Sequence, residues 1–78
     1  MTRTHFIRAL EEIFGLDPRT LREEGSRESI AEWTSLADVQ IFSLIDSEFG
    51  IEPTEELISA ETVGDLLRIL HDRGAFEE

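Results

Sequence analysis

The sequence predicts an all-α protein, an irregular four-helix bundle of three main helices and one short helix with a long first loop. Three observations support this fold class. Apolar residues recur three or four positions apart in three segments, helix caps flank those segments, and no segment alternates apolar and polar residues as a strand does. A chain of 78 residues, 1–78, forms one domain, close to the lower size limit for a self-supporting core.

The first predicted helix covers residues 4–14. Thr2 or Thr4 can cap its start, and Gly15 suits its C-terminal stop. Its apolar positions follow helical spacing and are Phe6, Ile7, Leu10, Ile13 and Phe14. This helix therefore presents one apolar face to the core.

After the first helix, Asp17 followed by Pro18 indicates one short helical turn within residues 16–21. The next stretch, residues 22–33, has weak apolar periodicity and is predicted to be an ordered loop. The apolar residues expected to pin the loop to the bundle are Leu21, Ile30 and Trp33. Trp33 is also expected to cover the end of the bundle near Ser35.

The second predicted helix runs from about Ser35 to Phe49 and is the central one, with Gly50 ending it. Its predicted core stripe is Leu36, Val39, Phe42, Ile45 and Phe49, widened by Ile41 and Leu44. We expect this stripe to face the other helices.

A short third helix follows Pro53, with acidic residues in its first turn. The last helix begins after Thr62, which caps it and forms a capping box with Asp65. Its inward residues are expected to be Val63, Leu66, Leu67 and Leu70. We expect fraying near Gly74, which leaves residues 75–78 as a tail.

The charge is strongly acidic and unevenly distributed. There are 18 acidic residues against 7 basic ones, all arginine, so the net charge is −11. Residues 1–30 hold five arginines and six acids, a net charge of −1, whereas residues 31–78 hold two arginines and twelve acids, a net charge of −10. This charge argues against a nucleic-acid partner and favours partners with basic patches. A solvated acidic surface that keeps a small protein soluble explains the same charge equally well.

The residue inventory also bears on metal sites, disulfides and location. The chain has no cysteine, so it has no disulfide and no thiolate metal site. His5 and His71 lack metal-ligand spacing and are expected to be exposed, so we expect no metal. The apolar runs are too short to span a membrane and the N-terminus lacks the apolar region of a signal peptide. We therefore expect a cytoplasmic protein.

Ser35 is the candidate functional residue. The stretch Ser35-Leu36-Ala37-Asp38 fits a capping box, which is a purely structural interpretation. Thr34 can be the cap instead, which leaves the Ser35 hydroxyl exposed at the first helical position. Unpaired N–H groups and the helix dipole favour an anion there, so Ser35 is well placed to bear a phosphate ester.

Three stretches, in this order, resemble the acyl carrier proteins: WTSLADVQIFSLIDSEFGIE, PTEEL and TVGDLLRIL. The stretch FGLDPRTL after the first helix is similar to the opening of that family, so the resemblance covers most of the chain. It implies that a phosphopantetheinyl transferase esterifies Ser35 with 4′-phosphopantetheine from coenzyme A. It further implies a monomeric carrier, not an enzyme, which holds acyl groups as thioesters and shuttles them between enzymes of a fatty-acid, polyketide or related specialised pathway.

The resemblance also implies residues that contact partner enzymes and cargo. The residues expected to dock partners are Leu36, Asp38, Asp46, Glu48, Glu55, Glu56 and Ile58, although a solvated face explains the acids as well. Exposed ion pairs are individually weak, so docking through the acids should be weak and salt-sensitive. The residues that can line an acyl cleft are Phe42, Ile45, Leu57, Val63 and Leu67, for each of which core packing is the alternative.

The sequence departs from the family at Thr34, where an Asp is usual, and at Ala37, where many members carry an acid. The linker after Ile51 is also one residue shorter than the common form. These departures leave open an interaction module that keeps the carrier fold without being modified. A hydrolase that pairs Ser35 with His5 or His71 is a further alternative, although no orienting residue or oxyanion motif is evident.

Overall fold

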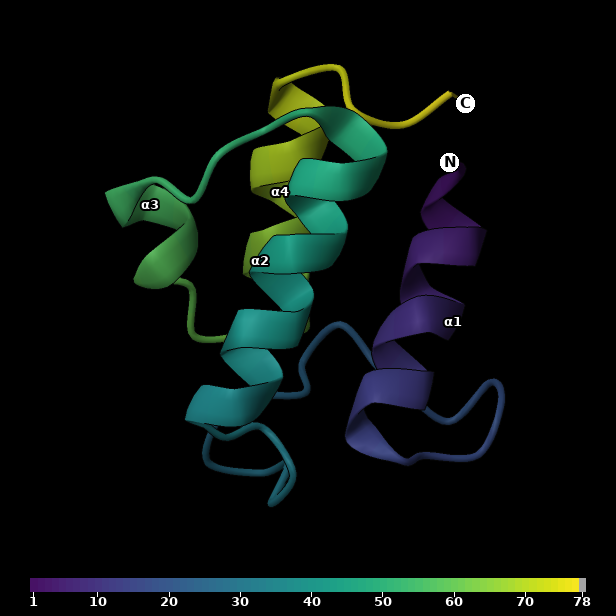
Figure 1. Cartoon of the computed structure of the whole chain (residues 1–78). Helices are drawn as coiled ribbons and strands as arrows, with labels where there is room; N and C mark the ends of the chain where they lie inside the picture. The colour runs from purple at the N-terminus through teal and green to yellow at the C-terminus, as the bar shows by residue number, and fades with distance from the viewer. Residues whose placement is uncertain (78) are drawn as a thin grey trace.

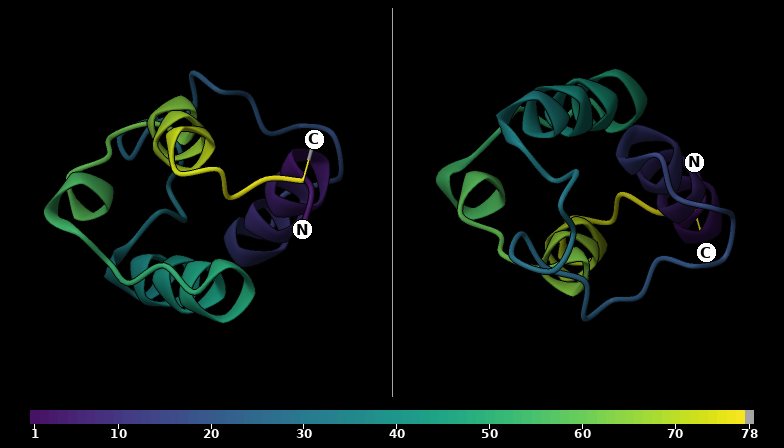
Figure 2. Two further views of the ribbon diagram at one scale, coloured as in Figure 1. Left: turned by 90° about the horizontal axis from the view of Figure 1, so that it is seen from above. Right: turned by 90° about the horizontal axis from the view of Figure 1, so that it is seen from below.

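The computed structural model describes residues 1–77 and contains four helices. They are α1 (Arg3–Phe14), α2 (Ser35–Phe49), α3 (Glu55–Ile58) and α4 (Val63–Asp72). Within residues 1–77 there is no strand, only an isolated bridge between Ser26 and Thr62. The four helices surround a shared interior, with α4 opposite α2 (Figures 1 and 2). The predicted all-helical class, with three main helices and one short one, is confirmed.

The helix ends follow local capping signals. Thr2 caps α1 by accepting a hydrogen bond from the His5 N–H, and Gly15 ends this helix with a φ of 70°. At the start of α4, Thr62 and Asp65 form the predicted reciprocal capping box. A left-handed Gly50 ends α2 in the same way as Gly15 ends α1. The bounds of the helices are therefore set by residues beside them in sequence.

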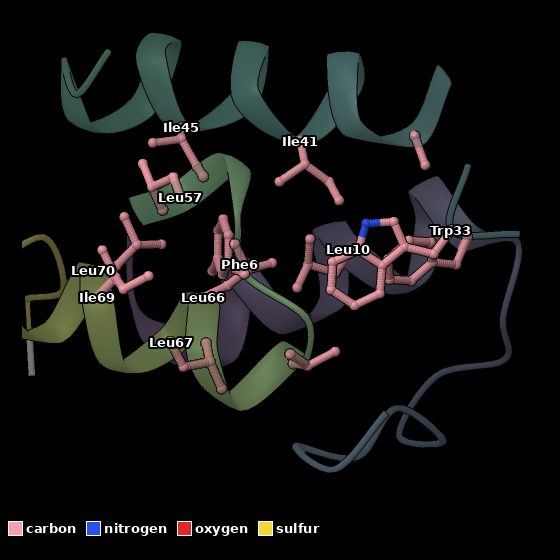
Figure 3. Close-up of a cluster of buried hydrophobic side chains, with 14 of the residues drawn as sticks. Phe6, Leu10, Trp33, Ile41, Ile45, Leu57, Leu66, Leu67, Ile69 and Leu70 are labelled. Atoms are coloured by element: carbon pink, nitrogen blue, oxygen red, sulfur yellow. The ribbon is translucent and has the colours of Figure 1, made fainter. Parts of the chain in front are cut away.

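The buried face of α2 differs from the prediction. Leu36 and Val39, expected in the core, are 68% and 65% exposed. Ala37, Ile41 and Ile45 are buried instead, and Figure 3 shows Ile41 and Ile45 pointing from α2 into the interior. The prediction was wrong because apolar residues occur on nearly every side of α2, so their spacing does not select one face.

The other predicted core residues lie largely as expected. Phe6, Leu10 and Phe14 of α1 are buried, while Ile7 and Ile13 pack against them partly exposed. The inward residues of α4 are all buried, and they are Val63, Leu66, Leu67, Ile69 and Leu70. The apolar core thus draws on all four helices, with Leu57 from α3.

The long loop between α1 and α2 is ordered by polar contacts as well as by its apolar residues. The carboxylate of Glu11, itself 3% exposed, accepts hydrogen bonds from the Thr20 and Leu21 N–H groups at 3.0 and 3.1 Å. Ile30 is buried and Leu21 packs against the core, as predicted. A buried carboxylate thereby satisfies backbone N–H groups that have no helix to join.

The loop also binds the start of α4. The carbonyl oxygens of Gly25 and Glu23 accept hydrogen bonds from the Val63 and Gly64 N–H groups, each at 2.9 Å. These N–H groups have no partner inside the helix, so the loop completes the cap of α4. Gly64 permits the close approach, since a Cβ atom there would lie 3.3 Å from the Glu23 oxygen.

The segment after Asp17 is a tight turn and not the predicted helical turn. The Thr20 N–H donates to the Asp17 carbonyl at 3.3 Å across Pro18 and Arg19. Arg19 has a φ of 67°, the positive value that the third position of a type II turn requires. Proline at the second position favours this turn, so Pro18 reverses the chain here instead of starting a helix.

The prediction of a frayed C-terminal tail is wrong at Phe76. Its ring lies 5.8 Å from that of Phe6 and 5.6 Å from that of Phe49, centroid to centroid. The Met1 amino group bonds the Glu77 carboxylate, so both ends of the described chain are held together. Glu78, also assigned to that tail, lies outside the described residues.

Substitutions on opposite sides of α2 will test which face is buried. Ile41→Ala should lower the free energy of unfolding by about 2–5 kcal/mol, because it leaves a cavity where a fully buried side chain stood. Val39→Ala removes an exposed side chain and should change this free energy by at most about 0.5 kcal/mol. Urea denaturation followed by circular dichroism measures both values. An equal loss of this free energy in the two variants would contradict the conclusion that Ile41, and not Val39, lies on the buried face of α2.

The capping box of α4 predicts a pH dependence of stability. The Glu61 N–H above all, and also the Thr62 N–H and hydroxyl, hold the pKa of the Asp65 carboxyl below its ordinary value of 3.8. The ionised Asp65 carboxylate therefore contributes to the free energy of unfolding above its ordinary pKa of 3.8. This contribution is lost as the pH falls through the lower pKa of the folded state. Asp65→Asn should cost about 1 kcal/mol at pH 7 and flatten the fall in stability below pH 5. Urea denaturation at each pH gives the free energy of unfolding of the unaltered protein and of Asp65→Asn. An equal fall in both proteins below pH 5 would contradict this role of Asp65.

Candidate functional site

Ser35 is the first residue of α2, and Thr34 is its cap. The Thr34 Oγ1 accepts a hydrogen bond from the Ala37 N–H at 3.4 Å. The capping box between Ser35 and Asp38 does not form, since Asp38 bonds other residues. Ser35 is exposed, and its hydroxyl makes no hydrogen bond within residues 1–77. Of the two sequence interpretations, the one with Thr34 as cap and a free Ser35 hydroxyl is confirmed.

A cluster of Arg27, Trp33 and Asp38 lies beside the start of α2. The Arg27 Nη1 donates to one Asp38 oxygen at 2.8 Å, and the Trp33 indole N–H donates to the other at 2.9 Å. The Arg27 guanidinium carbon is also 4.8 Å from the centre of the Trp33 ring. Both charged side chains are 25% exposed. Asp38, predicted to dock partners, therefore has both oxygens bonded within the protein.

Arg27 also joins the loop to the segment after α3. Its Nε donates to the Ala60 carbonyl at 2.8 Å, and its Nη2 donates to the Ile58 carbonyl at 3.4 Å. Its backbone N–H bonds the Glu61 carbonyl at 3.0 Å. Sequence analysis missed this residue. The available signal was that Arg27 is the last base before a stretch of nine acids without any base, Glu32 to Asp65.

Trp33 closes the end of the bundle near Ser35, as predicted. Its side chain is 5% exposed, and its ring lies 5.4 Å from that of Phe14. Figure 3 shows the indole beside the start of α2, with its nitrogen directed toward that helix. The residue before the cap is therefore fixed both by packing and by its bond to Asp38.

The other predicted docking residues lie on the surface of α2 and α3. Leu36 and Ile58 are large apolar side chains that are 68% and 54% exposed. The acids of this set are all exposed, and they are Asp46, Glu48, Glu55 and Glu56. Glu56 has a cation nearby, the Arg73 guanidinium at 4.0 Å. Their role in docking stays a prediction.

The residues predicted to line an acyl cleft are packed in the core. Ile45, Leu57, Val63 and Leu67 are at most 1% exposed, and Phe42 is half-buried. A groove with a volume of about 680 Å³ lies elsewhere, between α1 and α2. An acyl chain between α2, α3 and α4 would therefore have to displace side chains.

Both histidines are exposed and lie away from Ser35. His5 is in the first turn of α1 and His71 in the last turn of α4. Figure 1 shows these two helix ends at the end of the bundle opposite the start of α2, so neither imidazole can serve Ser35 as a base. Within residues 1–77, no cluster of three or more acidic, histidine or cysteine side chains can hold a metal. No helix of the described chain is long and apolar enough to cross a membrane.

A double-mutant cycle will test the coupling of Arg27 and Asp38. Arg27→Gln and Asp38→Asn should each destabilise, and the pair should show a coupling free energy of about 1 kcal/mol, because both charges are partly buried. The exposed pair Arg3 and Glu23, at 3.2 Å, is the control and should couple by less than about 0.5 kcal/mol. Urea unfolding monitored by the fluorescence of Trp33, the single tryptophan, measures both. Equal coupling free energies in the two pairs would contradict the conclusion that Arg27 and Asp38 interact more strongly than an exposed ion pair.

Two comparisons with known proteins find no match. No protein-family model matches the chain, and a search of curated proteins finds no similar protein. The function is therefore argued from the site itself. The relevant features are the exposed Ser35 hydroxyl at the start of α2, the Arg27 cluster beside it, and the exposed apolar residues nearby.

Proposed function

We propose that this protein is an acyl carrier protein that works as a cytoplasmic monomer, with 4′-phosphopantetheine attached to Ser35. In this proposal, the three main helices, the short α3 and the long first loop form an acyl-carrier bundle. The protein serves enzymes of a fatty-acid, polyketide or related specialised pathway. The observation that carries the proposal is the Ser35 hydroxyl at the first position of α2, which is exposed and makes no hydrogen bond in the described part of the chain.

The residues around Ser35 fit a phosphate ester. Thr34 supplies the cap, so esterification of Ser35 leaves the bond between the Thr34 hydroxyl and the Ala37 N–H intact. The positive end of the α2 dipole favours the negative charge of a phosphodiester. Both neighbours, Thr34 and Leu36, are exposed, which leaves a transferase access to the hydroxyl.

The attached group supplies a thiol, which a chain without cysteine lacks. The part of the protein in this chemistry is to hold the attachment point still and to present it to successive enzymes. Trp33 and the Arg27–Asp38 pair fix the backbone on both sides of Ser35. A tether from a fixed point keeps its cargo at high effective concentration around a docked enzyme.

The exposed acids of α2 and α3 suit enzymes that carry basic residues. Asp46, Glu48, Glu55 and Glu56 are solvent-exposed on these two helices, where opposite charge speeds encounter. Each contact contributes little, so a carrier bound through them can dissociate. In this proposal these residues orient the carrier, and Ser35 enters the active site of the enzyme.

Intact mass spectrometry will test the proposal. Incubation with coenzyme A and a panel of broad-specificity phosphopantetheinyl transferases should add one phosphopantetheine group to the protein. Ser35→Ala should abolish the mass gain, because it removes the oxygen to be esterified. Ser43→Ala removes another exposed hydroxyl of α2 and should leave the gain unchanged.

Two outcomes would contradict the proposal. Absence of any mass gain with the whole panel would favour the unmodified interaction module, in which Thr34 replaces the acid usual in carriers. A gain that persists in Ser35→Ala would place the group on another residue.

A further inference from the structure

Three arginines of this acidic protein have no ion pair. Within residues 1–77, the arginines that lie within 4.0 Å of a carboxylate are Arg3, Arg27, Arg68 and Arg73. Arg8, Arg19 and Arg22 are exposed and make no hydrogen bond or ion pair in this part of the chain. Their guanidinium groups can therefore bind an anion from outside the protein.

Two of these three arginines line one pocket, which we name the arginine pocket. It has a volume of about 210 Å³ and lies between α1 and the first part of the long loop. Its lining residues are Thr4, Ile7, Arg8, Glu11, Arg19 and Leu21. No residue of α2 lines it, so the pocket is separate from the Ser35 site.

The backbone at Arg19 is unfavourable for an arginine. Its φ of 67° is the only positive φ of a residue other than glycine within residues 1–77. The third position of a type II turn favours Gly or Asn, because most side chains are strained there. The Arg19 side chain makes no hydrogen bond or ion pair in the described chain that would offset this strain. Strained residues of this kind cluster at binding sites, which indicates a role for the Arg19 guanidinium in binding.

Glu11 joins the two sides of the pocket. Its carboxylate is 3% exposed and accepts hydrogen bonds from the Thr20 and Leu21 N–H groups, which directly follow Arg19. The loop is thereby bonded to α1 at the pocket. The lining residues carry two positive charges and one negative charge, a net charge of +1 in a chain of −11. The pocket therefore favours an anion.

The remaining lining is mainly apolar, and the pocket is small. Ile7 and Leu21 are partly buried side chains that pack against the core. A volume of about 210 Å³ holds about seven non-hydrogen atoms, if each takes the ~30 Å³ of a water molecule in the liquid. A short apolar chain that ends in an anionic group matches this lining and this volume.

We propose that the arginine pocket binds a short-chain monocarboxylate. The carboxylate lies at Arg8 and Arg19, because a planar guanidinium can donate two parallel N–H bonds to a carboxylate. The apolar chain lies on Ile7 and Leu21, where it leaves water. This site does not involve Ser35 and goes beyond the proposed function.

The end of a peptide presents similar chemistry but fits the pocket less well. Peptides bound in an extended form gain affinity from hydrogen bonds to the backbone of their partner. The Thr20 and Leu21 N–H groups at the pocket are already bonded to Glu11. The pocket therefore favours a free carboxylic acid, which needs no backbone donor.

NMR titration with butyrate will test the site. Butyrate should shift the methyl signals of Ile7 and Leu21 in a saturable way. Butyramide has nearly the same shape without the charge, and it should bind about fivefold more weakly, the upper range for an exposed ion pair. N-Acetylvaline copies the end of a peptide and should also bind more weakly than butyrate. Ser35→Ala should leave the Kd for butyrate unchanged.

Arginine variants locate the binding site. Arg8→Gln and Arg19→Gln should each raise the Kd for butyrate about fivefold. Arg22→Gln is the matched control, because it removes the same charge from an exposed arginine outside the pocket, and it should change the Kd less than about twofold. Arg19→Gly should weaken binding as much as Arg19→Gln. Its free energy of unfolding should not fall, because glycine adopts a positive φ without strain.

Several outcomes would overturn the inference. They are the absence of saturable shifts, equal binding of butyrate and butyramide, and tighter binding of N-acetylvaline. Equal effects of Arg19→Gln and Arg22→Gln would assign the binding to the general charge of the surface. A lower free energy of unfolding in Arg19→Gly would show that the Arg19 side chain serves the fold. None of these outcomes affects the proposed role of Ser35, which the mass gain with coenzyme A tests separately.

Discussion

The side chain of Arg27 joins three segments that also pack into the core through their own apolar residues. It contacts the Asp38 carboxylate of α2, the Trp33 ring, the carbonyl group of Ile58 at the end of α3 and that of Ala60 just after it. Arginine suits this position because its planar guanidinium offers five donors in fixed directions and stacks on an aromatic ring. The loop, the start of α2 and the end of α3 are therefore linked to one another near Ser35 by this one cation within an acidic part of the chain.

The helix limits could be predicted because they are encoded locally. Thr34, Thr62 and the left-handed Gly15 and Gly50 act on N–H and carbonyl groups within a few residues of themselves. The buried face of α2 is not local information. A helix with apolar residues on most sides can bury any of several faces, and the positions of α1, α3 and α4 decide among them. Leu36 and Val39 were misplaced for this reason.

The candidate site likewise has features that could be predicted from the sequence and others that could not. The exposure of Ser35 follows from the capping hydroxyl of its neighbour, Thr34, and could be anticipated from the sequence. The pairing of Arg27 with Asp38 spans 11 positions, and its bond to Ala60 spans 33, so no short pattern reveals either. The buried carboxylate of Glu11 was missed likewise, because its partners are backbone N–H groups of a loop whose path the sequence does not specify.

The contact between Met1 and Glu77 has a consequence for the geometry of larger assemblies. Met1 touches Glu77 at the pole of the bundle remote from the start of α2 (Figure 1). A neighbouring domain attached through either terminus would lie at that end of the bundle and leave the end with the start of α2 unobstructed. Several copies could accordingly be strung together by short connectors, with every Ser35 still turned toward the surrounding solution.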